Sequence, residues 1–83
     1  MMQLDILTPG KKVFSGDVIS STLPGVEGQF QILNNHAPII SILQAGNLKY
    51  RTAATGEQVI KVTGGLVEVN GNKIIVLADG ISE

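Results

Sequence analysis

The sequence of 83 residues contains no cysteine, and this absence excludes several classes of protein at once. Disulfide scaffolds, thiolate zinc sites, iron–sulfur clusters and thiol nucleophiles all require that residue. The chain also has no cluster of Lys or Arg, and its formal net charge is −1. Because binding to phosphates needs several grouped cations, we do not expect nucleic acid as a partner.

Long hydrophobic runs are missing as well. The longest run, residues 74–78, is far too short to span a bilayer. Residues 1–5 lack the charged start and the apolar core of a signal peptide. We therefore expect any association with a membrane to be indirect, through a partner protein.

What the chain does contain is typical of a small globular protein. Hydrophobic residues make up 43% of it and charged residues 16%. A chain of this size forms one domain and buries about 60–65% of its unfolded surface. We expect residues 1–83 to fold as a single domain with one modest core.

Almost every segment has the pattern of a β-strand. In residues 27–33, Phe30 and Ile32 alternate with Gln29 and Gln31, which is the period of a half-buried strand. Turn residues recur at short intervals, and the ten glycines disfavour a helix. The pattern predicts an all-β domain, either a sandwich or a barrel.

Three short stretches are expected to interrupt these strands. Residues 15–17, Ser-Gly-Asp, should separate one short strand from the next, and Pro24-Gly25 should end a strand before residue 27. Asn70-Gly71 is a strong hairpin dipeptide and predicts a turn between the last two strands.

Four short motifs occur in the same order as in the epsilon subunit of the F-type ATP synthase. They are Leu4-Asp5, Phe14-Ser15-Gly16, residues 27–38 (EGQFQILNNHAP) and residues 63–79, which end in Leu-Ala-Asp. The chain resembles that family over nearly its whole length. The resemblance implies a two-sheet β-sandwich of about ten short strands. Family members usually continue into a hairpin of two helices; since the sequence stops at Glu83, functions of those helices are not transferred.

The resemblance also implies a function without catalysis. Such a subunit sits in the central stalk, docks the gamma subunit and the c-ring, and couples ion-driven rotation to ATP synthesis. It needs no cofactor and hydrolyses no nucleotide itself. It would lie at the cytoplasmic face of a bacterial membrane, held there by the complex.

Two sets of contact residues follow from the resemblance. The motifs align the gamma-facing side with Thr8, His36, Ser41, Thr63 and Glu68. They align the c-ring contact with Glu27, Gly28, Gln29, Phe30, Gln31 and Leu33. Family members often carry an acid where Gln29 stands and a glycine where Gln31 stands, so charge pairing with the ring would depend on Glu27.

Other chemistry was weighed against this interpretation. His36 could act as a general acid or base, but no nucleophile or metal ligand accompanies it in the sequence. The seven acidic residues are scattered, and nothing local pairs two of them for hydrolysis. Gly64-Gly65 lacks the Lys-Ser/Thr of a phosphate loop and indicates a bulge or closely packed backbones. We expect no catalytic, cofactor or metal site.

A carrier domain is the alternative from another class. Lipoyl and biotinyl domains are also all-β, have about eighty residues and present one lysine at a hairpin tip. Lys61 would be that residue here. It is off-centre, its flanks differ from the carrier pattern, and the two halves of the chain do not repeat.

Overall fold

The structure, a computed structural model, describes residues 2–34 and 37–82. These residues form ten strands and no helix, which confirms the all-β prediction. The strands are β1 (Met2–Thr8), β2 (Lys11–Val18), β3 (Ser20–Gly25), β4 (Gly28–Ile32), β5 (Ile39–Leu43), β6 (Gly46–Thr52), β7 (Gly56–Val62), β8 (Gly65–Asn70), β9 (Lys73–Ala78) and β10 (Ile81–Ser82).

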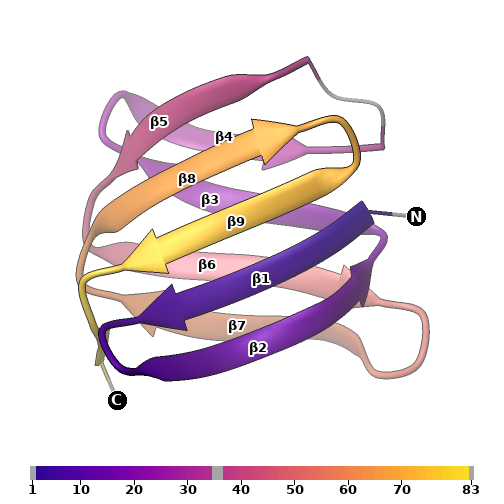
Figure 1. Cartoon of the computed structure of the whole chain (residues 1–83), viewed down its shortest axis with the longest axis horizontal. Helices are drawn as coiled ribbons and strands as arrows, with labels where there is room; N and C mark the ends of the chain where they lie inside the picture. Colours follow the sequence, from indigo (N-terminus) through magenta and orange to yellow (C-terminus); the bar gives the residue numbers. More distant parts are fainter. Residues whose placement is uncertain (1, 35–36, 83) are drawn as a thin grey trace.

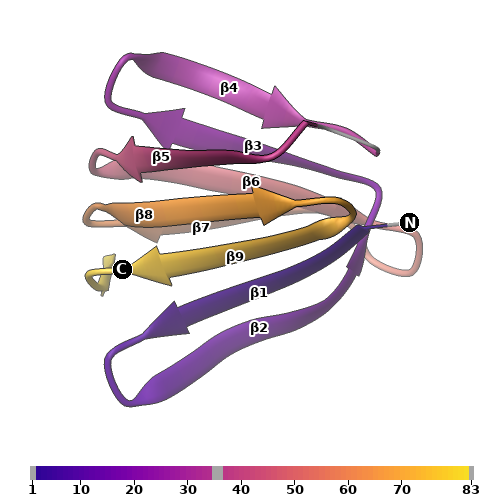
Figure 2. The ribbon, with the colours of Figure 1, turned by 45° about the horizontal axis from the view of Figure 1, so that its top comes forward.

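The strands form one sheet that curls into two layers. The hydrogen-bonded order is β10-β7-β6-β3-β5-β8-β9-β1-β2, and β4 pairs with β3. In Figures 1 and 2, β5, β8, β9, β1 and β2 form a front layer, with β4, β3, β6 and β7 behind it. We call the second group, together with β10, the back layer. The predicted sandwich is confirmed, with β1 and β9 as its parallel pair.

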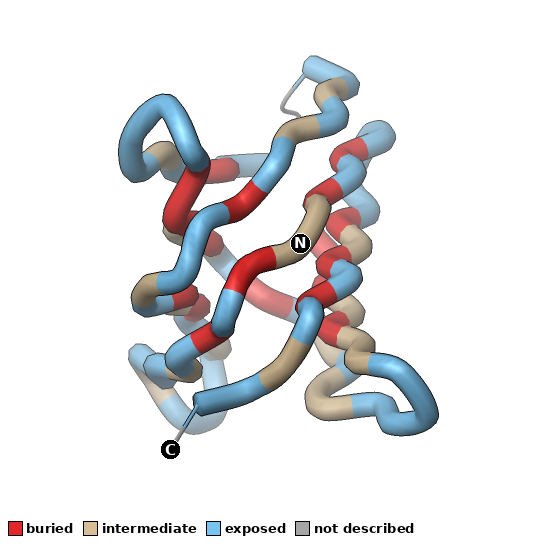
Figure 3. The backbone as a smooth tube through the Cα atoms, turned by 90° about the vertical axis from the view of Figure 1, so that its left-hand side faces the viewer, coloured by how far each residue is buried: buried red, intermediate tan, exposed pale blue. Residues whose placement is uncertain are grey.

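The core lies between the layers and follows from alternation along the strands. Figure 3 shows buried residues alternating with exposed ones. Leu48 and Tyr50 share one face of β6, and both are buried. The ring of Tyr50 contacts that of Phe14 on β2, with centroids 4.4 Å apart. The remaining buried apolar residues are Met2, Leu4, Ile6, Val18, Leu23, Ile32, Leu43, Val62, Val67, Val69, Ile74, Val76 and Ala78.

One predicted interruption is wrong, because pairing with a neighbouring strand overrides a local turn signal: residues 15–17 lie inside β2, where Ser15 pairs with Asp5 of β1. The other is confirmed, since Pro24 and Gly25 are the last two residues of β3. Pro24 lies beyond Thr22, where the pairing with β6 ends. Its missing N–H is therefore not needed by that ladder, and its carbonyl accepts a bond from Gln44 N at 2.8 Å.

The predicted hairpin between the last two strands is present, but its turn is shifted by one residue. Asn70 still pairs with Lys73, so the two connecting residues are Gly71 and Asn72. Gly71 has a φ of 63°, the left-handed conformation that such a tight turn requires.

A short seam joins the two layers and positions the β3–β4 turn. Gly25 of β3 pairs with Leu43 of β5, and Val26 N donates to Ile42 O at 3.1 Å. A Cβ at residue 25 would lie 2.8 Å from Cε1 of Phe30, so the aromatic ring packs directly on this glycine. The seam therefore brings Val26 beside the front layer.

Candidate docking surfaces

The outer surface of the front layer carries a line of apolar side chains that crosses four strands and continues to the β3–β4 turn. Residues opposite each other in a ladder present their side chains on the same face. Ile42 pairs with Leu66, Leu66 with Leu77, and Leu77 with Leu7. The seam extends this line to Val26, which is one residue beyond the pair of Gly25 with the buried Leu43. We call Val26, Ile42, Leu66, Leu77 and Leu7 the apolar row.

The apolar row is accessible to a partner. Ile42 is 61% exposed, Val26 51% and Leu77 49%. β1, β5 and β9 all end, and β8 begins, at the left-hand side of Figure 1, so the row lies near that end of the front layer. A contiguous exposed apolar patch on a small domain usually marks an interaction site, whereas single exposed apolar residues do not.

A second line of side chains lies beside the apolar row on the same face. Glu68 pairs with Ile40 on one side and with Ile75 on the other, and Ile75 pairs with Asp5. Ile40 is the most exposed large apolar side chain of the described residues, at 68%. The front face therefore carries the apolar row and, beside it, a second line in which apolar and acidic side chains alternate.

At the end of the apolar row, the surface is hollowed. A cavity of about 370 Å³ is lined by Leu7, Thr8, Pro9, Leu77, Ala78 and Asp79. Two members of the apolar row thus form one wall of a recess that carries a carboxylate at its rim. Such a recess fits an apolar side chain of a partner better than a flat surface does.

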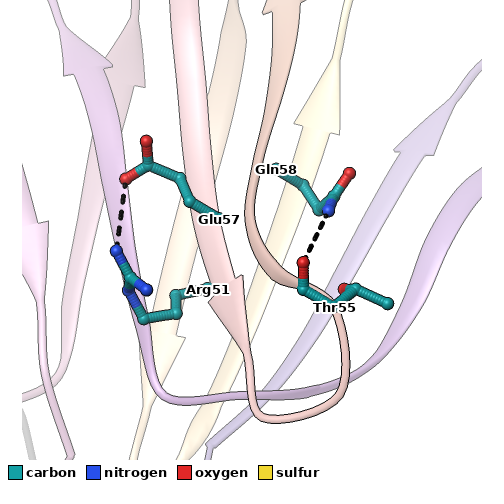
Figure 4. A network of polar contacts seen from close by, with 4 residues as sticks. All are labelled: Arg51, Thr55, Glu57 and Gln58. Atoms are coloured by element: carbon teal, nitrogen blue, oxygen red, sulfur yellow. Dashed lines mark hydrogen bonds and ion pairs between the residues drawn. The ribbon is translucent and has the colours of Figure 1, made fainter.

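The outer surface of the back layer has the opposite character. Arg51 and Glu57 face each other across β6 and β7, with Nη2 and Oε1 3.9 Å apart (Figure 4). Gln58, which follows Glu57 in β7 but pairs with the buried Tyr50, donates to the carbonyl of Thr55 at 3.2 Å (Figure 4). Lys49 pairs with Val59, which is 53% exposed and has polar neighbours. The back face is polar and basic, and it offers no apolar row in the part that the structure describes.

The five residues predicted to face gamma do not form one cluster. Glu68 lies on the outer front face beside the apolar row. Thr8 and Gly80 line one surface hollow, and Thr63 bonds to Gly80 O through Oγ1 at 3.3 Å, so Thr8 and Thr63 lie at the same end. Ser41 pairs with the buried Val67 and is half-buried on the inner side of β5. His36 lies outside the described residues, and its contact with gamma stays a prediction.

The residues predicted to face the c-ring extend along the whole β3–β4 hairpin. Glu27 is exposed in the turn, next to Gly28, and Leu33 is 53% exposed at the other end of β4. Gln29 and Gln31 are exposed on the outer side of β4. Phe30 points inward onto Gly25 and is half-buried, so it supports the hairpin rather than presenting its ring to a partner.

The apolar row itself was missed by the sequence reasoning, although the sequence carries a signal for it. Residues 39–42 (IISI) and 74–77 (IIVL) are apolar at both odd and even positions. In a strand with one solvated face, apolar and polar residues alternate strictly. A strand with apolar residues on both faces usually has both faces buried against other groups. The broken alternation in β5 and β9 therefore indicated a partner for the outer face.

Lys61 does not have the position of a carrier lysine. It lies in β7, paired with Asn47 of β6 and with Ser82 of β10, and so sits within a ladder rather than at a hairpin tip. The described ranges contain no group of three or more His, Cys, Asp or Glu side chains arranged to hold a metal ion. Among the same residues we find no helical segment with the length and hydrophobicity of a membrane span.

One carboxylate of the front face is held by hydrogen bonds. Ser15 Oγ donates to Asp5 Oδ1 at 2.6 Å, and Gln3 Nε2 lies 3.4 Å from the same oxygen. The bond from Ser15, above all, lowers the pKa of Asp5 from its ordinary 3.8, with smaller contributions from Gln3, Lys73 and Lys12. Ionised Asp5 therefore adds stability above its unfolded pKa, and this stability is lost as the pH falls through the lower, folded pKa.

We expect Asp5→Asn to destabilise the chain near neutral pH by less than about 1 kcal/mol, because the group is exposed. Urea unfolding of the parent and the variant at a series of pH values measures the difference. It should shrink toward zero in acid below the normal pKa of Asp5. Ser15→Ala should reproduce part of the effect. A difference that grows as the pH falls would contradict the assignment.

Comparisons with known proteins agree with this architecture. The sequence profile of the family described as the β-sandwich domain of the ATP synthase delta/epsilon chain matches residues 1–83. The chain is 41% identical over 80 residues to the ATP synthase epsilon chain of Chlorobium limicola, which covers 96% of this chain and 91% of that one. It is also 41% identical over 80 residues to the epsilon chain of Wolinella succinogenes, of which it spans 61%.

Solved structures share the fold. A chain in the cryo-EM structure of the Euglena gracilis mitochondrial ATP synthase (OSCP/F1/c-ring in rotational state 1) superposes with a TM-score of 0.90 at 17% identity, covering 98% of this chain and 52% of that one. A chain from the central stalk/c-ring structure of the Tetrahymena thermophila mitochondrial ATP synthase gives 0.82 at 23% identity, covering 99% and 66%. Together with the profile and the bacterial relatives, these observations show that the chain belongs to the ATP synthase delta/epsilon family, whose β-sandwich domain residues 1–83 form.

Proposed function

We propose that the chain is a non-catalytic central-stalk subunit of an F-type ATP synthase that binds gamma through the apolar row and the c-ring through the β3–β4 turn. In this role it couples ion-driven rotation to ATP synthesis, and it lies at the cytoplasmic face of a bacterial membrane through its partners alone. The observation that carries the proposal is the apolar row, with three members about half exposed or more.

The difference between the two faces supports the choice of surface. The front face presents apolar side chains from four strands and the β3–β4 turn in one line, whereas the back face presents Lys49, Arg51 and Glu57 around a single exposed Val59. Burial of apolar area is the main favourable term in association. Binding of a partner to the front face therefore releases more free energy than binding to the back face. A layered sheet also suits force transmission, because its ladders hold the docking residues in fixed positions.

The β3–β4 turn is the proposed contact with the c-ring. Within the described residues, β4 pairs with β3 alone, so the hairpin stands at an edge of the back layer. Its turn presents the side chain of Glu27 to solvent beside Val26, the first member of the apolar row. Because one charge at a wet rim contributes about 0–1 kcal/mol, Glu27→Gln should change ring binding little and only at low salt.

The test of the proposal is the affinity of the chain for purified gamma. We expect the double variant Ile42→Gln, Leu77→Gln to weaken binding at least tenfold and up to several hundredfold. Fully burying such a side chain stabilises by about 1.5–3 kcal/mol, and each 1.4 kcal/mol is about a factor of ten. Isothermal titration of gamma with each variant gives the dissociation constants.

Val59→Gln on the back face is the matched control. Val59 is 53% exposed and Leu77 49%, so both substitutions make an equally accessible site polar. Val59→Gln should leave the affinity for gamma unchanged, and circular dichroism should show all variants folded. If Val59→Gln weakens binding as much as the double variant does, or if the double variant binds like the parent, the apolar row is not the docking face.

A further inference from the structure

The shape of the apolar row limits what can cover it. The row crosses four strands and adds Val26 beside β5 as a fifth position, and adjacent positions lie about 4.8 Å apart, so the row is about 19 Å long. Along the strand direction, the next side chains on the same face stand about 7 Å away, and they are Ile40, Glu68, Ile75 and Asp5. The apolar row is therefore longer than it is wide, with two carboxylates among its lateral neighbours.

Backbone hydrogen bonding further limits the occupant. β8 is paired on both sides, with β5 and β9, and β9 is paired with β8 and β1. Over β8 and β9, the sheet face therefore offers no free backbone group to an arriving segment. An extended segment lying across it would bury its own N–H and C=O groups without partners, at a cost of about 1–3 kcal/mol each. A helix satisfies these groups internally, and its apolar stripe is narrow like the row.

The charges around the apolar row indicate which residues should flank the apolar stripe of a bound helix. Glu68 lies two residues from Leu66 on β8, Asp79 lies two residues beyond Leu77, and Glu27 follows Val26. None of these three carboxylates has a hydrogen bond or an ion pair to a side chain within residues 2–34 and 37–82. They lie on the rim of an apolar surface and would attract a cationic partner group, even though Lys12 pairs with Leu7 and Lys11 lines a hollow with Asp79 at one end of the row.

We propose that the apolar row binds an amphipathic helix of about 13 residues whose apolar stripe is bordered by Lys or Arg. At a rise of 1.5 Å per residue, such a helix spans the row of about 19 Å. One apolar side chain near its end enters the hollow formed by Leu7 and Leu77, and the flanking cations pair with Glu68 and Asp79. A second copy of this chain is a poor occupant, because it would place the same carboxylates opposite one another.

This inference rests on the proposal that the apolar row is the docking face, and it is tested with designed peptides. Two labelled 14-residue helical peptides share one leucine stripe; lysines border the stripe in the first and glutamates in the second. Fluorescence anisotropy measures their binding to the 83-residue chain at low and high salt. We expect the lysine peptide to bind at least tenfold more tightly than the glutamate peptide, and high salt to reduce this ratio.

Variants of the chain assign the effect to the proposed groups. The double variant Glu68→Gln, Asp79→Asn should weaken binding of the lysine peptide about tenfold, with little remaining salt dependence. Glu57→Gln on the back face is the matched control and should bind like the parent. The pair Ile42→Gln, Leu77→Gln should abolish binding of both peptides.

Several results would overturn the inference. Equal binding of the two peptides, or an effect of Glu57→Gln as large as that of the rim variants, would remove the role of the carboxylates. If gamma binds through the apolar row but the lysine peptide does not bind, the helix is wrong and the docking face stands. If the peptide binds and gamma does not, the proposed function fails instead. A dimer formed through the row, seen by analytical ultracentrifugation and abolished by Leu77→Gln, would show that a second copy is the occupant.

Discussion

Gly65→Ala should lower the free energy of unfolding by about 3 kcal/mol or more, which corresponds to a fall in melting temperature of at least about 12 °C for a domain of this size. Gly65 has a φ of 148°, which side-chain-bearing residues rarely adopt. A Cβ there would overlap the carbonyl oxygen of Leu77 and approach Cα of Ala78 to 2.9 Å. Both contacts are with backbone of β9, which cannot move without breaking the ladder. Thermal and urea unfolding followed by circular dichroism measure the loss.

Gly10→Ala is the control for this variant. Gly10 also has a positive φ, 78°, but a Cβ there would meet nothing within 4 Å. The substitution should therefore cost only the conformational strain, about 1–2 kcal/mol. The difference between the two variants isolates the overlap with β9. Equal losses would show that β8 and β9 do not pack as closely at Gly65 as the structure indicates.

Leu48→Ala is expected to destabilise the domain by about 3–5 kcal/mol, since a buried leucine leaves both lost contacts and a cavity. Leu48 is fully buried in the centre of β6. A domain with a total stability of about 5–10 kcal/mol would then be close to unfolding at ambient temperature. Urea denaturation of the purified variant gives the midpoint and the slope.

Leu33→Ala makes the same chemical change at an exposed position. Leu33 is 53% exposed after the end of β4, so its truncation should cost less than about 1 kcal/mol. It belongs to the predicted c-ring contact, and the stable variant can therefore be used to measure ring binding. If Leu33→Ala unfolds the domain as readily as Leu48→Ala, the end of β4 is more closely packed than described.

Much of the candidate site could be named from the sequence, but its arrangement could not. The motifs named Glu27 and Glu68 as contact residues, and both are exposed, Glu27 in a turn and Glu68 on a strand face. The same motifs grouped Ser41 with Glu68, although the structure places them on opposite sides of the front layer. A motif conserves order along the chain, whereas a contact surface depends on which strands become neighbours.

The apolar row shows why register matters. Its members are spread from Leu7 to Leu77 and come together only because β5, β8, β9 and β1 pair in one particular alignment and the seam adds Val26. A shift of one residue in any ladder would turn that strand's outward residues inward. Periodicity within each strand carries no information about the neighbour's register, so the row could be seen only after the sheet was assembled.

The sequence by itself determined the all-β class, the hairpin before Lys73 and the alternation that buries Leu48 and Tyr50, because these depend on neighbours close along the chain. Only the tertiary structure decided that residues 15–17 continue a strand, that Pro24 is tolerated, and that a seam at Gly25 joins the two layers. These features are set by hydrogen bonds and packing between segments distant in sequence. The free energy of such contacts exceeds a local turn preference, and it becomes visible only when the partner strand is in place.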